Sequence, residues 1–449
     1  MLNQPIICRF APSPTGFLHV GNIRAAIVNF LFTKKNNGQF FLRFDDTDVT
    51  RSSDEYRKQI IKDLDWLNIK YDQEIYQSKR LDIYQKYIKE LIATKRLYAC
   101  FETNEELELQ RKLQAKQGVP PIYDRACLHL TDEQKENYLK AGRKPYYRFL
   151  LKDQETSWND LVKGKISFKG RHFSDPVVIR DNGSPTYTFC SVIDDIDFKI
   201  SHIIRGEDHI TNTAIQIQIF QSLNANLPEF AHLALIKNSN GKISKRIGGF
   251  DIKSLKESGF ENLAIINLLS QVGTSKSLQI YPDIEKLITN FNLSNFSKST
   301  TNYDLGELEN INQKLLQVID YDKIKFSEFT SKVISKELWN ALSPNISKAN
   351  EINQWLEIID DNFTNNNQSC DQQFLENCAE LLPEDLNADN SFDLWLTQIK
   401  ESNPERKGKN LFMPIRLALT NLEHGPELKT LFKILPRKEI IRRLLLFVN

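Results

Sequence analysis

The 449-residue chain lacks any run of about 18 or more apolar residues, which excludes a transmembrane helix. Its first residues lack the basic start and long apolar stretch of a signal peptide, so we expect none. Cysteine is scarce, with six scattered copies, and we expect reduced thiols in a cytoplasmic protein rather than a disulfide framework. A net charge of only +1 does not by itself indicate a nucleic-acid partner. These absences argue against a membrane protein and a disulfide-rich secreted protein.

The remaining composition is that of an ordinary globular protein, with 40% hydrophobic and 26% charged residues. The chain is too long for a single hydrophobic core, so we expect roughly two to four domains. Positive charge gathers in residues 405–449, where ten Lys and Arg stand against four Glu. Such a stripe can contact phosphates, but a solvated helix face explains it equally well.

Hydrophobic periodicity divides the chain into a mixed front half and a helical back half. An apolar strand at 6–10, a Pro- and Gly-containing turn, a helix at 22–35 and a strand at 39–44 indicate the start of a parallel α/β sheet. The mixed texture of residues 97–186 indicates an inserted subdomain. Strand-like texture returns at 187–204, and beyond residue 250 helical periods dominate.

The first motif with chemical content is RFAPSPTGFLHVGN at residues 9–22. Its prolines and glycine fix a turn between a strand and a helix, and the start of a helix offers free N–H groups that suit phosphate. Gly21 allows close approach of the backbone to a ligand, and His19 can donate a hydrogen bond to a phosphate oxygen. A histidine alone would more simply be a hydrogen-bonded structural residue.

The second motif is KISKR at residues 242–246, after an apolar run. Its two lysines, Lys242 and Lys245, can neutralise negative charge that builds on a leaving phosphate. Taken alone, the motif would be read as a basic surface turn.

Together these motifs resemble the HIGH and KMSKS signatures of class I aminoacyl-tRNA synthetases, in the form found in the glutamyl-tRNA synthetase family. Residues 41–48, 187–195 and 202–209 are similar to segments that form the family's amino-acid pocket. The resemblance implies an α/β fold: a Rossmann-like catalytic domain with an inserted acceptor-binding subdomain, then an all-α anticodon-binding region. It implies these boundaries: catalytic halves at 1–96 and 187–250, the acceptor-stem insertion at 97–186, a connecting domain at 251–320, and the anticodon domain at 321–449.

The same resemblance implies roles for individual residues. Catalysis falls to His19, Gly21, Lys242 and Lys245. ATP binding adds Pro12, Thr15, Asn22, Asp208 and Ser244. Glutamate binding falls to Arg9, Ser13, Asp45, Tyr187, Ser191, Arg205 and His209.

Two glutamate-site positions depart from the family pattern. Asp45 stands where many members carry the longer Glu, so its contact with the amino group of glutamate is shifted or mediated by water. Ser191 stands where many relatives have Asn. An arginine fork is suited to a substrate carboxylate because it stays charged and binds two oxygens, although which arginine takes which carboxylate stays open. A surface ion pair is the simpler structural alternative for Arg205 and Asp208.

Four residues of the insertion fall where some relatives hold a zinc knuckle: Cys100, Glu102, Cys127 and His129. Their types are acceptable zinc ligands. Glu102 replaces a cysteine, however, and buried cysteines without metal are common. We therefore predict no structural zinc.

The back half also resembles the family, at the junction 303–312 and in the last helical domain at 407–420 and 423–428. The resemblance thus implies a glutamate–tRNA ligase that uses ATP with Mg²⁺, L-glutamate and tRNA(Glu), and that acts as a cytoplasmic monomer. One alternative is an enzyme that also or instead glutamylates tRNA(Gln) for later amidation. Another is a catalytically idle tRNA-binding paralogue. A glutaminyl enzyme is disfavoured because its anticodon region is a β-barrel, and a nucleoside-modifying paralogue because it usually lacks this region.

Overall fold

The computed structural model describes residues 5–48, 51–169, 173–238, 251–324, 326, 330–360, 363–364 and 371–446. The chain forms two compact units. Unit 1 comprises Met1–Leu255 and Ile265–Asp304, and unit 2 comprises Lys256–Ala264 and Leu305–Asn449.

A five-stranded parallel sheet with strand order β10-β9-β1-β2-β3 is the centre of unit 1. Its strands are β1 (Ile7–Phe10), β2 (Gln39–Phe44), β3 (Gln73–Tyr76), β9 (His202–Gly206) and β10 (Glu229–Leu233). The chain leaves β1 for β2 on one side, and the later strand β9 lies on the other. The strand order therefore reverses beside β1, and ligands of such sheets bind at the carboxyl ends of the strands next to this reversal.

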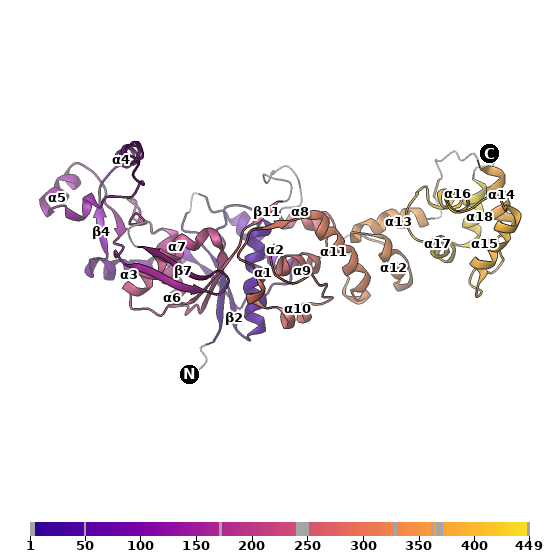
Figure 1. Ribbon diagram of the computed structural model, residues 1–449, viewed down its shortest axis with the longest axis horizontal. Helices are drawn as coiled ribbons and strands as arrows, with labels where there is room; N and C mark the ends of the chain where they lie inside the picture. The colour runs from indigo at the N-terminus through magenta and orange to yellow at the C-terminus, as the bar shows by residue number, and fades with distance from the viewer. Residues whose placement is uncertain are drawn as a thin grey trace. The chain divides into compact units, whose positions relative to one another are not determined.

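Helices cover both faces of this sheet. They are α1 (Val20–Lys35), α2 (Asp54–Trp66), α6 (Tyr187–Asp197) and α7 (Ile210–Ser222), while α3 (Leu81–Ala93) packs against α6 and β4 (Leu97–Cys100). Figure 1 shows α1 on one side of the strands and α6 and α7 on the other. The expected strand texture at 187–204 is wrong for its first part, because residues 187–197 form α6. Seven consecutive residues of α6 are buried, and they include Phe189, Val192 and Ile193, whose types are favoured in strands.

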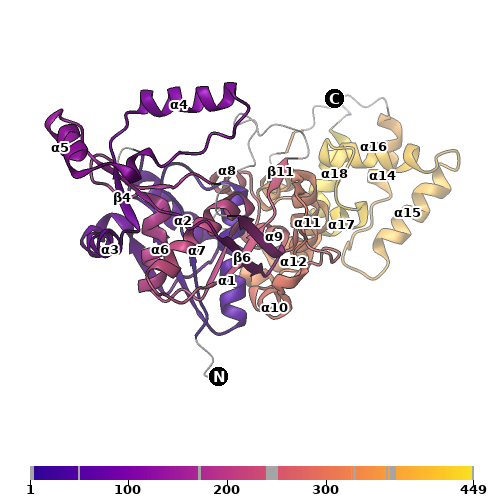
Figure 2. The same cartoon turned by 60° about the vertical axis from the view of Figure 1, so that its left-hand side comes forward.

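Between α3 and α6 the chain forms a smaller antiparallel sheet with two peripheral helices. The strands are β4 (Leu97–Cys100), β5 (Tyr146–Phe149) and β8 (Val177–Ile179), and the helices are α4 (Asn104–Lys116) and α5 (Asp132–Lys140). Both helices begin with a capping box and bury no residue. Figure 2 shows them at the edge of unit 1.

A hairpin in the same stretch packs on the parallel sheet instead. It consists of β6 (Glu155–Asp160) and β7 (Gly164–Lys169). Its Trp158 belongs to one hydrophobic cluster with Ile203 of β9 and Phe230 of β10, and the Leu161 N–H donates to the Phe230 carbonyl at 2.8 Å. The hairpin therefore lies against the strands that form one side of the switch point.

The last part of unit 1 contains a short parallel pair and leads into further helices. The strands are β11 (Ile236–Asn238) and β12 (Thr301–Tyr303), and the helices are α8 (Ile252–Glu257), α9 (Asn262–Gln271) and α10 (Ile284–Asn290). Segments of α8 and α9 contribute to both units.

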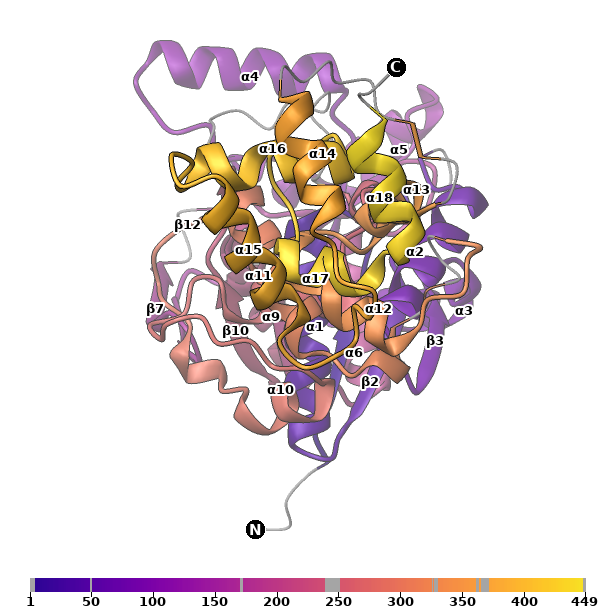
Figure 3. The same ribbon diagram turned by 90° about the vertical axis from the view of Figure 1, so that its right-hand side faces the viewer.

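Among its described residues, unit 2 forms helices and no strands, as the all-α expectation required. Its α-helices are α11 (Leu305–Val318), α12 (Lys336–Leu342), α13 (Ile352–Ile359), α14 (Gln372–Glu380), α15 (Ser391–Ser402), α16 (Lys409–Thr420), α17 (Leu428–Ile434) and α18 (Arg437–Leu445). Figure 3 shows α14 to α18 gathered together. Trp339, Trp355 and Trp395 lie in one core with apolar residues of these helices. In the part of the chain that the structure covers, no helix has the length and apolarity needed to span a membrane.

Candidate active site

The turn between β1 and α1 places His19 at the helix N-cap. Its Nδ1 accepts a hydrogen bond from the Gly21 N–H at 3.1 Å, so the ring proton is on Nε2, which is available as a donor. Burial lowers the pKa of His19, although the charge of Asp208 opposes this, and the ring is neutral at pH 7. A Cβ on Gly21 would lie 3.0 Å from the His19 ring, so glycine leaves room for this ring position.

The other residues predicted for ATP lie at the same edge of the sheet or outside the described residues. Asp208 follows β9, and a Cβ on Gly206 would lie 2.4 Å from its Oδ1. The turn after β1 also exposes three predicted residues: Ser13, Thr15 and Asn22. The Pro12 carbonyl accepts from the Asp45 N–H at 3.1 Å, which joins this turn to the end of β2.

Lys242, Ser244 and Lys245 lie outside the described residues. The residues that follow them are paired with the His19 turn, since Asp251 forms a bridge with His19 and the Ile252 N–H donates to the Leu18 carbonyl at 3.3 Å. Asp251, five residues after the second motif in the sequence, therefore lies beside the start of α1.

One group of predicted glutamate-site residues surrounds Arg205 at the end of β9. Its Nη1 donates to the Tyr187 hydroxyl at 3.2 Å, and the rings of Tyr187 and His209 lie 5.8 Å apart. Burial, with the nearby charge of Arg205, lowers the pKa of His209 to about 4. His209 is therefore neutral at pH 7, and the positive charge of the group belongs to arginine.

Ser191 is joined to Arg205 through Gln216, a residue that the sequence did not single out. The Ser191 hydroxyl donates to the Tyr187 carbonyl at 2.8 Å and accepts from Gln216 Nε2 at 2.7 Å. Gln216 Oε1 accepts from Arg205 Nη2 at 2.7 Å. Ser191 is therefore connected to Arg205 indirectly, through the hydrogen bond that holds Gln216.

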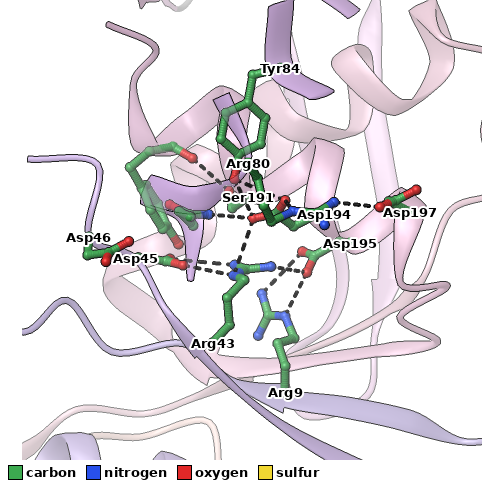
Figure 4. Close-up of polar contacts among 12 residues, drawn as sticks. Arg9, Arg43, Asp45, Asp46, Arg80, Tyr84, Ser191, Asp194, Asp195 and Asp197 are labelled. Carbon is green, nitrogen blue, oxygen red and sulfur yellow. Dashed lines mark hydrogen bonds and ion pairs between the residues drawn. The ribbon is translucent and has the colours of Figure 1, made fainter. Parts of the chain in front are cut away.

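A second group joins Arg9 and Asp45 through Arg43 and Asp195 (Figure 4). Arg9 donates to both carboxylate oxygens of Asp195, at 3.1 and 3.4 Å. Arg43 Nη1 donates to Asp195 at 2.7 Å, while its Nε donates to Asp45 at 2.8 Å. All four side chains are buried. Arg43 thus links the residue predicted to bind the amino group to the residue that holds Arg9.

The two aspartates of this group titrate differently. Burial raises the pKa of Asp45 to about 6, although Arg43 opposes the shift. Burial also acts on Asp195, but the charges of Arg9 and Arg43 outweigh it and hold the pKa of Asp195 below its ordinary value. Asp195 is consequently a fixed negative charge, and Asp45 is the carboxylate that can change charge near neutral pH.

Asp194, the neighbour of Asp195 in α6, binds a further set of side chains. It accepts hydrogen bonds from Arg80 at 2.8 Å, Gln77 at 2.8 Å and the Tyr84 hydroxyl at 2.9 Å (Figure 4). The motifs predict no role for Arg43, Asp194 or Asp195, although these residues lie within the segments that resemble the family's pocket. Two adjacent aspartates in an otherwise apolar run are the signal that could have found them, because buried carboxylates need charged partners.

The possible metal ligands of the insertion form a cluster one ligand short of a structural zinc site. In the described part of the chain, ligand atoms of Cys100, Glu102 and Cys127 lie within 4.8 Å of one another, whereas the exposed His129 is not in this group. Glu102 already accepts from the hydroxyls of Tyr123 at 2.6 Å and Tyr146 at 2.9 Å. The hydrogen bond between Cys100 and Cys127 raises the pKa of Cys100 and lowers the pKa of Cys127. Among the described residues the cluster offers three ligands, and a structural zinc site would need a fourth.

Comparison with known proteins agrees with this geometry. Residues 5–310 match the family described as tRNA synthetases class I (E and Q), catalytic domain. Residues 336–447 match an anticodon binding domain. The parallel sheet and its edge site thus belong to a class I tRNA synthetase, and the helical region beyond it to the part that binds an anticodon.

Individual similar proteins narrow the class I tRNA synthetases to one amino-acid specificity. Glutamate–tRNA ligase 1 of Rickettsia rickettsii (strain Sheila Smith) is 50% identical over 442 residues, covering 98% of this chain and 99% of that protein. Glutamate–tRNA ligase 1 of Rickettsia prowazekii (strain Madrid E) is 49% identical over 443 residues, with the same coverage. A crystal structure of a glutamate tRNA ligase from Elizabethkingia meningosepticum, in complex with its amino acid, matches 98% of each chain with a TM-score of 0.83 at 25% identity. The chain therefore belongs to the glutamate–tRNA ligases, a family of class I aminoacyl-tRNA synthetases.

Proposed function

We propose that this protein activates L-glutamate with ATP and transfers it to the 3′-terminal adenosine of tRNA(Glu). The observation that carries the proposal is the meeting of Arg9, Asp45, Tyr187 and Arg205 at the sheet edge where α1 begins, in a chain of this family. Arginine and tyrosine donors for two carboxylates, with one aspartate for an ammonium group, suit an amino acid such as glutamate, and the adjacent helix N-terminus suits a phosphate.

Glutamate binds between the two groups of charged side chains. Arg9, Arg205 and Tyr187 receive its carboxylates, and Asp45 receives its ammonium group. Ser13 and His209 line the site, and Ser191 contributes through Gln216. Arg43 and Asp195 supply the opposite charges that keep Asp45 and Arg9 in place.

ATP binds at the start of α1. Its phosphates face the start of α1 at Gly21 and Asn22 and the Nε2–H of His19, while Pro12 and Thr15 shape the turn. Asp208 contacts the ribose. We assign Lys242, Ser244 and Lys245 to the phosphates by their match to the family's second motif, and Asp251 and Ile252, which follow that motif in the sequence, are paired with His19 and Leu18. Mg²⁺ bound with ATP supplies further positive charge to the phosphates.

The reaction has two steps. An α-carboxylate oxygen of glutamate attacks the α-phosphorus, and the bond to the oxygen that bridges to the β-phosphate breaks, releasing pyrophosphate. A ribose hydroxyl of the terminal adenosine then attacks the carbonyl carbon of glutamyl-adenylate, and AMP leaves. Because no covalent enzyme intermediate is needed, positioning of reactants and stabilisation of developing negative charge account for the rate.

The rest of the chain binds tRNA. We assign the acceptor stem to the insertion at 97–186, the connection to 251–320 and the anticodon to 321–449, the last supported by the anticodon-domain match at 336–447. The catalytic halves are 1–96 and 187–250. We further propose that the enzyme is a cytoplasmic monomer. The alternative is that the enzyme also or instead glutamylates tRNA(Gln), and a charging assay with both tRNAs distinguishes the two.

The catalytic assignment is tested with Lys245→Ala. Loss of the lysine removes the positive charge proposed to stabilise the leaving pyrophosphate, so adenylate formation should slow by about a hundredfold or more while tRNA binding is retained. The measurement is glutamate-dependent exchange of labelled pyrophosphate into ATP, with tRNA present. Lys89→Ala, an exposed lysine of α3, is the control and should keep its exchange rate. Equal rates for Lys245→Ala and the unmodified enzyme would contradict the assigned role.

A further inference from the structure

Behind the glutamate pocket, a chain of hydrogen bonds leads from Arg205 to the β6–β7 hairpin. Arg205 Nη2 donates to the Thr213 hydroxyl at 2.6 Å, Thr213 Oγ1 lies 2.8 Å from His232 Nε2, and His232 Nδ1 lies 2.5 Å from Asp160 Oδ2. These four residues come from β9, α7, β10 and the end of β6. All of them are buried, and Thr213 and His232 are fully inaccessible to solvent.

The proton positions along this chain follow from Asp160. Burial disfavours its ionised form, but the bond from His232 and backbone N–H groups of Lys163 and His232 outweigh burial and lower the pKa of Asp160. An ionised Asp160 only accepts, so His232 carries its proton on Nδ1. Burial lowers the pKa of His232 despite Asp160, which leaves Nε2 as an acceptor for the Thr213 hydroxyl at 2.8 Å, nearer than that hydroxyl's other acceptor, the His209 carbonyl at 3.2 Å.

This direction of donation leaves the Thr213 oxygen free to accept from Arg205. Gln216 Oε1 accepts from the same Nη2 atom at 2.7 Å, so both hydrogens of Nη2 are used. Arg205 Nε is buried and has no hydrogen-bond partner among the residues that the structure describes. The guanidinium is therefore held through Nη2 from behind and through Nη1 by Tyr187, while the Nε–H and the second N–H of Nη1 remain for a ligand.

We propose that Thr213, His232 and Asp160 are positioning residues for glutamate binding. They fix the orientation of Arg205, so that its remaining N–H groups meet a substrate carboxylate without prior rearrangement. The inference rests on the proposed role of Arg205 as a glutamate ligand. It gives the hairpin, which contributes Asp160, a part in the amino-acid site.

The test compares Thr213→Val, which removes the hydroxyl at nearly constant volume, with Thr213→Ser, which keeps it. The valine variant should raise KM for glutamate about tenfold, as expected for a lost hydrogen bond to a charged group, with kcat and KM for ATP within about twofold of the unmodified enzyme. The serine variant should keep KM for glutamate within about twofold. Thr33→Val is a matched control, because Thr33 is equally buried and donates to the Asn29 carbonyl at 2.7 Å.

An unchanged KM for glutamate in folded Thr213→Val would overturn the proposal. So would losses in kcat and in both KM values that Thr33→Val reproduces, since these would indicate a structural role only. If the valine variant does not fold, Thr213→Ala removes the same hydroxyl without the added methyl group and is held to the same criteria. Failure of the unmodified enzyme to activate glutamate would instead contradict the proposed function.

Discussion

At the scale of single residues, the pocket contains positive and negative side chains in alternating contact. Asp195 lies between Arg9 and Arg43, and Arg43 lies between Asp195 and Asp45. Buried charges are stable only with partners of opposite sign, and each of these has one. The arrangement fixes the side chains before substrate arrives, which lowers the cost of organising the site during binding.

Asp45 gives the pocket a predicted pH dependence. Its pKa of about 6 means that it is almost fully ionised at pH 7.5 and about one quarter ionised at pH 5.5. Protonation removes the negative charge proposed to bind the ammonium group, so kcat/KM for glutamate should fall about fourfold between these pH values. The measurement is a pH profile of kcat/KM for glutamate.

Asp45→Asn is the control for this profile. Its kcat/KM should be low throughout and should lose the step near pH 6, because an amide does not titrate there. A profile for Asp45→Asn that keeps the same step would assign the titration to another group and contradict the role of Asp45.

The sequence could predict the site residues that lie within motifs, but not the residues that form hydrogen bonds with them. Arg9 lies in the first motif, Tyr187 and Arg205 lie in segments that resemble the family's pocket, and the structure brings Tyr187 and Arg205 together. Asp160 and His232 are separated by 72 positions, and neither has a neighbouring pattern that predicts their contact. Such contacts depend on how the hairpin packs on β10, which single-sequence periodicity does not contain.

At the scale of elements, helices with clear end signals were predicted well. The helix expected at 22–35 is α1, which occupies Val20–Lys35 and carries Lys34 and Lys35 in its last turn. Helix α6 was mistaken for strand texture because its residues include Phe189, Val192 and Ile193, types favoured in strands. Its packing against α3 and α7 outweighs that local preference.

Gly425, between α16 and α17, provides a test at this scale. Its φ is +141°, and a Cβ there would lie 2.2 Å from Trp355 Cη2. Gly425→Ala should therefore lower the free energy of unfolding by about 3 kcal/mol, combining steric overlap with backbone strain. Urea unfolding followed by tryptophan fluorescence measures this, since three of the five tryptophans lie in unit 2.

Gly118→Ala is the control that separates backbone strain from steric overlap. Gly118 also has a positive φ, +68°, but a Cβ there would meet nothing within 4 Å. This substitution should cost only about 1 kcal/mol from backbone strain. Equal losses for the two variants would show that contact with Trp355 contributes nothing.

At the scale of the whole molecule, the chain separates its two tasks into units with separate cores. Unit 1 contains the parallel sheet and the proposed site for glutamate and ATP, and unit 2 is helical in its described residues. The family matches divide the chain similarly, into a catalytic part at 5–310 and an anticodon-binding part at 336–447. Amino-acid activation and recognition of the tRNA anticodon are thus assigned to different units.

The most direct test is charging of purified tRNA(Glu) and tRNA(Gln) in parallel, with ATP, Mg²⁺ and labelled glutamate or glutamine. We expect ATP-dependent attachment of glutamate to tRNA(Glu) and no attachment of glutamine. Attachment of glutamate to tRNA(Gln) as well would widen the substrate range and indicate a later amidation step. Absence of glutamylation of either tRNA, with tRNA binding intact, would contradict the account and identify a catalytically idle paralogue.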